Sequence, residues 1–221
     1  MHQRESSLTS KKESILSTHA VLRNTYLLLS LTLIFSGAIA YFAMVTNAQP
    51  VQPILFLVGA FGLMFLTQAT SKTSWGLLSV FLFTGFMGYT LGPILNMYLH
   101  AYANGAQLIS TALGATGVIF LGLSAYTVTT KKDFSYMGGF MVVFGLTLMI
   151  GVFLSFFIPA ISIFISMAFV LFASAMIMFQ TSMIINGGER NYIMATVSLY
   201  VSIYNLFLSL LRILSAFSGR N

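Results

Sequence analysis

The chain has 221 residues, of which 57% are hydrophobic and only 6% are charged, and its formal net charge is +6. Soluble domains carry roughly 25% charged residues, so this composition excludes a soluble globular enzyme, and its many apolar side chains exclude a disordered chain. The chain has no cysteine, which excludes disulfides, thiolate catalysis and cysteine-ligated metal. The composition, with a mean hydropathy of +0.91, indicates a protein that resides in a lipid bilayer.

Residues 1–24 differ in composition from the rest of the chain. The segment is rich in serine and charged residues and has too few apolar side chains to form a core. We predict a flexible cytoplasmic tail over residues 1–24, followed by a transmembrane domain over residues 25–221. The basic side chains of the tail are Arg4, Lys11, Lys12 and Arg23, with His19 among them.

Seven long apolar stretches follow the tail. A helix needs about 20 apolar residues to cross roughly 30 Å of hydrocarbon, and each stretch is close to or above that length. The stretches cover residues 26–46, 54–71, 75–97, 107–129, 136–158, 160–185 and 192–217. Because the connections are too short for a soluble domain, we predict an all-α polytopic membrane protein with its seven helices in one bundle.

Basic residues in the short loops predict the orientation, because lysine and arginine are enriched in cytoplasmic loops. The tail contains four basic residues. The second loop contains one, the fourth contains two and the sixth contains one, whereas the other loops contain none. The basic loop residues are Lys72, Lys131, Lys132 and Arg190. This pattern predicts a cytoplasmic N-terminus and a periplasmic C-terminus. Arg212 and Arg220 oppose this assignment, because they place basic residues at the periplasmic end of the last helix. Two alternatives follow for that helix: it crosses the membrane fully, or it enters deeply without crossing.

Small residues recur at helix-packing intervals in the third and fourth stretches. They are Gly85, Gly88 and Gly92 in the third, and Ser110, Gly114 and Gly117 in the fourth. In lipid, small side chains let helix backbones approach closely, so we predict helix contacts at both sets. The alternative is a gating hinge at Gly92-Pro93, because proline removes a backbone donor and can kink a helix.

The last stretch carries a line of polar residues at intervals of four, three, four and three. They are Ser198, Ser202, Asn205, Ser209 and Arg212, which fall on one face of a helix. A polar face inside a membrane turns toward other helices or a water-filled cavity. Two interpretations stay open: hydrogen bonding between helices with Arg212 reaching the membrane surface, or a polar pathway or pocket.

Four neutral polar residues on other helices could meet this polar line in the interior of the bundle. They are Gln180 and Thr181 in the sixth stretch and Tyr89 and Asn96 in the third. Structural hydrogen bonding is the simpler interpretation of such groups, and a transport pathway is the alternative.

Catalytic, metal and nucleic-acid sites are not indicated. The histidines and the carboxylates lie in the tail or the loops, so no pair is available at mid-membrane for proton transfer or metal binding. The basic residues are scattered along the chain instead of forming a patch suited to nucleic acid. We therefore expect a protein without a cofactor and without enzymatic activity.

Three consecutive segments form a specific pattern: FQTSMII at 179–185, GGERNYI at 187–193 and SLYVSIYNLF at 198–207. Segments within 16–26, 62–67, 84–96 and 124–133 extend the pattern over nearly the whole chain. In this order the segments resemble the Bax inhibitor-1 family of seven-helix membrane proteins, and within it the bacterial YccA branch.

The resemblance implies an inner-membrane protein that associates with the membrane-bound FtsH protease and modulates it. Membrane lipid is the other expected partner, because the basic residues of the tail can contact anionic lipid. In that branch the N-terminal tail is the handle by which the protease engages the protein. The matching handle here is residues 1–24, with Arg4, Lys11, Lys12, His19 and Arg23 as candidate contacts.

Other members of the family are similar in fold but act as pH-sensitive calcium leaks that use a pair of acidic residues. The matching positions here are Gln180 and Ser202, which cannot titrate and are weak calcium ligands. A cation leak or small-solute transporter is the alternative function, and these two residues weaken it.

Overall fold

A computed structural model describes the backbone of residues 2–219 and the side chains of residues 19–219. Within these residues the chain forms seven α-helices and two single-turn 3₁₀ helices, with no strand. The α-helices are α1 (His2–Val45), α2 (Pro53–Thr70), α3 (Trp75–Ala101), α4 (Gly105–Thr130), α5 (Gly138–Ser155), α6 (Ser162–Ile185) and α7 (Tyr192–Ser218). The 3₁₀ turns Ser135–Met137 and Pro159–Ile161 precede α5 and α6.

Each of the seven helices contains a segment long and apolar enough to cross a membrane. This confirms the predicted polytopic all-α bundle, and the helix ends differ from the predicted ones by a few residues at most positions. In α3 the helix passes through Pro93 without interruption and continues to Ala101.

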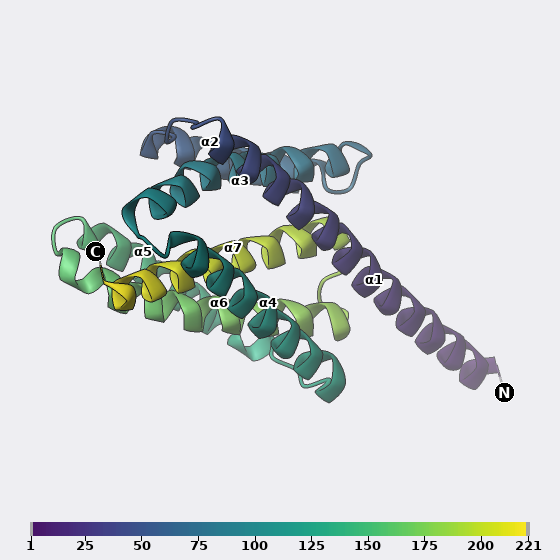
Figure 1. Cartoon of the computed structure of the whole chain (residues 1–221). Helices are drawn as coiled ribbons and strands as arrows, with labels where there is room; N and C mark the ends of the chain where they lie inside the picture. Colours follow the sequence, from purple (N-terminus) through teal and green to yellow (C-terminus); the bar gives the residue numbers. More distant parts are fainter. Residues whose placement is uncertain (1, 220–221) are drawn as a thin grey trace.

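The largest difference from the predicted boundaries is the start of α1. The helix begins at His2 and passes residue 24 without a break, and its N-terminal part extends beyond the other helices (Figure 1). The physical reason is that the segment before residue 37 contains no glycine or proline, the residues that most disfavour a helix. The N-terminal segment is too polar to form a core, but its composition still permits a helix. The membrane-crossing part of α1 begins at His19.

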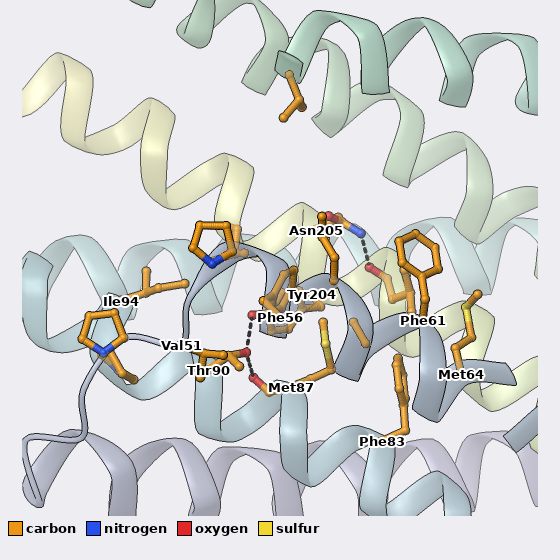
Figure 2. Close-up of a pocket in the computed structure, with 18 of the residues that line it drawn as sticks. Val51, Phe56, Phe61, Met64, Phe83, Met87, Thr90, Ile94, Tyr204 and Asn205 are labelled. Carbon is orange, nitrogen blue, oxygen red and sulfur yellow. Dashed lines mark hydrogen bonds between the residues drawn. The ribbon is translucent and has the colours of Figure 1, made fainter. Parts of the chain in front are cut away.

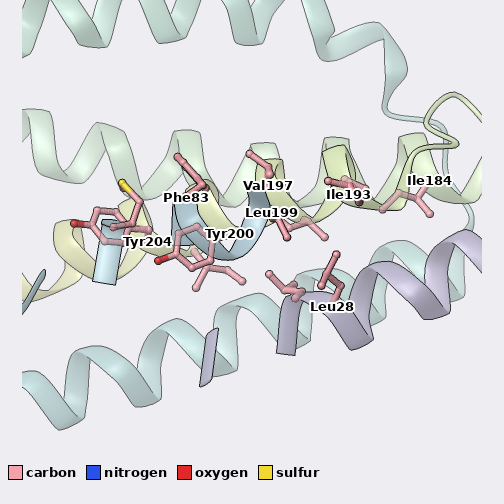
Figure 3. Packing of buried hydrophobic residues seen from close by; sticks show 13 residues of the cluster. Leu28, Phe83, Ile184, Ile193, Val197, Leu199, Tyr200 and Tyr204 are labelled. Carbon is pink, nitrogen blue, oxygen red and sulfur yellow. The ribbon is translucent and has the colours of Figure 1, made fainter. Parts of the chain in front are cut away.

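Helix α7 occupies the centre of the bundle. It contacts α1, α2, α3, α4 and α6, while α2 packs on the outside of α3 and α5 packs on the outside of α6 (Figure 1). The main core cluster lies where α1, α3 and α7 meet, around Leu29, Phe83 and Tyr200 (Figure 3). The peripheral helices contribute little to the interior, since Thr67 is the one buried residue of α2.

Glycines allow the close approach of α1 and α3. A Cβ atom added to Gly88 would clash with the backbone carbonyl oxygen of Ser36, and one added to Gly92 would lie 2.8 Å from the carbonyl oxygen of Ala40. These contacts confirm the predicted packing role of the glycines in the third helix.

The matching prediction for the fourth helix is wrong. A Cβ atom added to Gly114 or Gly117 would have no neighbour within 4 Å, and Ser110 and Gly114 are exposed. The small residues share one face of α4, but no helix of the described chain packs against that face at Gly114 or Gly117.

A hydrogen bond made by a loop asparagine lies at each of the two ends of the bundle. At one end, Asn191 Nδ2 donates to the carbonyl oxygen of Ser71 at 3.2 Å. At the other end, Asn104 Nδ2 donates to Ser218 Oγ at 2.7 Å. Helix α7 connects the two ends with 27 residues, or about 40 Å, which exceeds the roughly 30 Å of hydrocarbon. It therefore has the length of a complete crossing.

The first of these ends collects the basic residues. Five Lys and Arg side chains are exposed there, on α1 and on the three loops that join α2 to α3, α4 to α5 and α6 to α7. They are Arg23, Lys72, Lys131, Lys132 and Arg190. We call this end the basic end.

Candidate functional site

A cleft runs along α7 between α2 and the α5–α6 pair. It consists of a large pocket of about 940 Å³ and a small pocket of about 340 Å³. The two pockets share three lining residues, Met64, Val201 and Asn205, so they form one continuous cleft. The small pocket lies toward the basic end, and the large pocket lies toward the opposite end, where α7 finishes.

The cleft exists because α7 packs asymmetrically. Its face with Leu199, Tyr200 and Leu206 is fully buried against neighbouring helices, whereas α2 and α5 do not contact each other anywhere in the described chain. Several α7 residues that line the space between those two helices are therefore only partly covered by protein; they include Ser198, Val201, Asn205 and Arg212.

The small pocket has a polar wall. Its lining includes Ser198, Ser202 and Asn205 of α7 and Gln68 of α2. Ser202 Oγ donates to the carbonyl oxygen of Ser198 at 2.9 Å, and Asn205 Nδ2 donates to that of Val201 at 2.9 Å. The polar side chains are thus partly satisfied by their own helix, and none of the four is ionisable.

The large pocket is mainly apolar. The polar side chains in its lining are Thr90, Tyr204, Asn205 and Arg212, and the rest of the wall is formed by aliphatic, aromatic, methionine and proline side chains. The hydroxyl groups of Thr90 and Tyr204 lie 3.4 Å apart (Figure 2). Arg212 is exposed and is the one charged residue of the lining.

Four residues of the predicted polar line on α7 face this cleft. They are Ser198, Ser202, Asn205 and Arg212. Ser209 is buried and does not line either pocket. The line therefore divides between a cleft wall and a packed interior, which neither sequence interpretation alone describes.

The other predicted residues lie elsewhere. Gln180 is half-buried outside both pockets, and the hydroxyl of the buried Thr181 lies 3.4 Å from that of Tyr26. Asn96 donates to Asn47 Oδ1 at 2.8 Å, and Tyr89 is exposed on the outer surface of α3. The structure does not bring these four residues to the polar line.

Of the candidate protease contacts in the tail, the structure describes the side chains of two. His19 and Arg23 are exposed at the start of the membrane-crossing part of α1. The side chains of Arg4, Lys11 and Lys12 lie outside the described residues.

Sequence reasoning missed two contributors to the cleft. Gln68 is the single amide within the otherwise apolar α2, a signal that was available in the sequence. Tyr204 follows Tyr200 by one helical turn, and the two rings stack with centroids 6.2 Å apart. Among the described side chains, no group of three His, Asp, Glu or Cys residues could hold a metal ion.

A family model described as "Inhibitor of apoptosis-promoting Bax1" matches residues 18–219. The match spans all seven membrane-crossing segments and therefore covers the whole fold described above. The chain belongs to the Bax inhibitor-1 family.

Curated relatives in this family match the chain over almost its full length. An uncharacterized protein of Pseudomonas aeruginosa is 50% identical over 221 residues, 99% of both chains. The "Modulator of FtsH protease YccA" of Escherichia coli (strain K12) is 50% identical over 212 residues, 95% of both chains. A protein of Escherichia coli O6:H1 with the same identity and coverage is named "Inner membrane protein YccA".

Proposed function

We propose that this Bax inhibitor-1 family protein is a non-enzymatic regulator that binds an FtsH-type membrane protease and modulates its activity. The observation that carries the proposal is the 50% identity, over 95% of both chains, to the Escherichia coli protein named a modulator of that protease. Similarity at this level over the full length supports a shared role as well as a shared fold. The same relatives support a location in the bacterial inner membrane.

The proposed orientation places the basic end in the cytoplasm. Five exposed Lys and Arg side chains lie at that end, and α1 leads from it toward the N-terminus. Lysine and arginine next to membrane spans are retained on the cytoplasmic side, which supports a cytoplasmic N-terminus and a periplasmic C-terminus. The segment before His19 is then available to a protease that acts in the cytoplasm.

Co-purification from mild detergent tests the association. We expect the tagged full-length protein to retain an FtsH-type protease at a level well above that retained by an unrelated seven-helix membrane protein. Equal retention by the two proteins would contradict the proposed binding.

Deletion of residues 2–18 tests the handle. This deletion leaves the membrane-crossing part of α1 intact, including the Thr25 carbonyl that accepts a hydrogen bond from Thr196 Oγ1 at 3.3 Å. We expect the shortened protein to persist in cells after synthesis is stopped, while the full-length chain is degraded. A full-length variant with Arg4, Lys11 and Lys12 changed to glutamine separates the contribution of the charges from that of tail length. Unchanged turnover of the shortened protein would contradict the handle.

A second candidate function is the passage of a small polar solute, and one observation favours it. Four neutral polar side chains, from Gln68, Ser198, Ser202 and Asn205, line one pocket within the membrane-crossing region. A calcium leak has less support because Gln180 and Ser202 replace the acidic pair and Gln180 lies outside the cleft. Flux into liposomes that Asn205→Leu abolishes would support passage, and flux equal to that of empty liposomes would exclude it.

A further inference from the structure

Arg212 lies at an unusual position for a charged side chain. It is six residues before Ser218, the last residue of α7, which places it about 9 Å from that end of the helix. A helix of this length extends only a few ångströms beyond the hydrocarbon on each side, so the backbone of Arg212 lies just inside the apolar layer. An arginine at this depth extends its guanidinium group to the level of the lipid phosphates.

Among the described side chains, residues 19–219, no carboxylate lies next to this arginine. No acidic residue lines the large pocket. Asp133 and Glu189 lie at the basic end, where they accept hydrogen bonds from the backbone N–H groups of Ser135 and Asn191. The remaining acidic residues, Glu5 and Glu13, belong to the N-terminal segment, which leads away from that same end. The described side chains therefore leave Arg212 open to pair with an anion from outside the protein.

The large pocket next to Arg212 is suited to an acyl chain. Its volume of about 940 Å³ lies near the upper limit for pockets that hold whole small molecules, roughly 300–1,000 Å³. Phe56, Ala60 and Phe61 of α2 form one wall. Val152 of α5 and Phe156, the residue that follows α5, contribute to the opposite side. Because α2 and α5 do not contact each other in the described chain, the pocket opens sideways to the bilayer between them.

We propose that the large pocket is a binding site for an anionic phospholipid, with an acyl chain in the apolar cleft and the headgroup phosphate on Arg212. Charge complementarity favours this occupant over a transmembrane helix of a partner protein, because an apolar partner helix would leave the guanidinium group unpaired. Guanidinium groups bind phosphate through two parallel hydrogen bonds, which fixes the headgroup at the mouth of the pocket. This proposal does not depend on the proposed association with a protease.

Thermal unfolding of the purified full-length protein in phosphatidylcholine nanodiscs tests the site. We expect phosphatidylglycerol, added at increasing mole fraction, to raise the melting temperature by more than the same addition of phosphatidylcholine. In the Arg212→Gln variant, the phosphatidylglycerol needed for half of this effect should rise about fivefold or more. The same lipid should remain bound to the wild-type protein in native mass spectrometry.

A matched arginine variant controls for general attraction to negative membranes. Arg190→Gln removes the same charge from the basic end, where Arg190 is exposed and far from the pocket. We expect this variant to respond to phosphatidylglycerol as the wild type does. An equal loss of response in both arginine variants would overturn the proposal in favour of non-specific attraction.

A second pair of variants tests the acyl chain separately from the charge. Ala60→Phe places a ring in the pocket, whereas Ala69→Phe places the same ring on the exposed surface of the same helix, outside the pocket. We expect Ala60→Phe alone to reduce the phospholipid bound in native mass spectrometry. Unchanged lipid binding by Ala60→Phe would overturn the proposal. The proposal would also be overturned if this variant lost a co-purifying membrane protein while the amount of bound lipid stayed constant.

Discussion

The hydroxyl oxygens of Ser36 on α1 and Tyr200 on α7 lie 2.5 Å apart in the buried centre of the bundle. The Tyr200 hydroxyl also lies 3.4 Å from the carbonyl oxygen of Thr84 on α3, so one side chain joins three helices. In a membrane, where the hydrophobic effect does not drive helices together, such hydrogen bonds and close packing determine which helices associate.

Tyr200→Phe should destabilise the bundle by about 0.5–1.5 kcal/mol, because it removes the hydroxyl and retains most of the ring contacts. Reversible unfolding in mixed micelles measures this change in the free energy of unfolding. Ser36→Ala and the double variant complete a mutant cycle. A coupling free energy of zero would show that the short distance between the two hydroxyl groups contributes nothing to stability.

Gly88→Ala should destabilise the bundle by about 1–3 kcal/mol, because the added methyl group would clash with the carbonyl oxygen of Ser36 and separate α1 from α3. Gly114→Ala is the matched control, since its methyl group would meet nothing within 4 Å. The control should be neutral or slightly stabilising, because alanine favours a helix by up to about 1 kcal/mol over glycine. Equal effects in the same unfolding assay would contradict the assigned contact between α1 and α3.

Asn191 should stabilise the basic end in two separable ways. Its side-chain oxygen accepts hydrogen bonds from the N–H groups of Ile193 and Met194 at the start of α7, and its Nδ2 donates to Ser71. Asn191→Ala should cost about 1–2 kcal/mol of unfolding free energy, because it removes both interactions. Asn191→Asp should cost less, since a carboxylate still caps the helix and loses only the donor. Equal losses for the two variants would show that the cap contributes nothing.

Asp133 should make the loop between α4 and α5 sensitive to acid. Its carboxylate accepts a hydrogen bond from the N–H group of Ser135 at 2.8 Å, which lowers the pKa of Asp133 below its ordinary value of 3.8. The carboxylate is exposed, so its contribution to stability is small. That contribution is complete above the ordinary pKa and disappears as the pH falls through the lower pKa of the folded state.

The measurement for Asp133 compares melting temperatures of the wild type and Asp133→Asn from pH 6 to pH 3. The difference in favour of the wild type should shrink as the pH approaches 3. A difference that stays constant over this range would contradict the hydrogen bond to the ionised form.

The chain contains no cysteine, so single introduced cysteines can report the orientation of the protein in the membrane. Lys72→Cys marks the basic end, and Ala103→Cys marks an exposed position between α3 and α4 at the opposite end. In intact spheroplasts, an impermeant maleimide should label the cysteine at position 103 and reach the one at position 72 only after permeabilisation. The reverse labelling pattern would invert the proposed orientation.

Composition and hydrophobic pattern were sufficient to predict the membrane environment and the number of membrane crossings. A chain with 57% hydrophobic and 6% charged residues requires a lipid environment. Each membrane crossing needs a continuous apolar stretch, which can be recognised in the sequence without knowledge of the neighbouring helices. The helical period also showed that Ser198, Ser202 and Asn205 share a face, because that relation depends only on positions within one helix.

The contacts of each helix face could not be predicted in this way and became known from the packing of the helices. Gly88 and Gly114 belong to similar patterns of small residues, yet one contacts α1 and the other faces outward. Ser209 lies two turns after Ser202 and lines neither pocket, while Arg212 one turn later is exposed in the large pocket. The reason is that periodicity defines the faces of a helix, whereas the partner of each face depends on the packing of helices that are distant in the sequence.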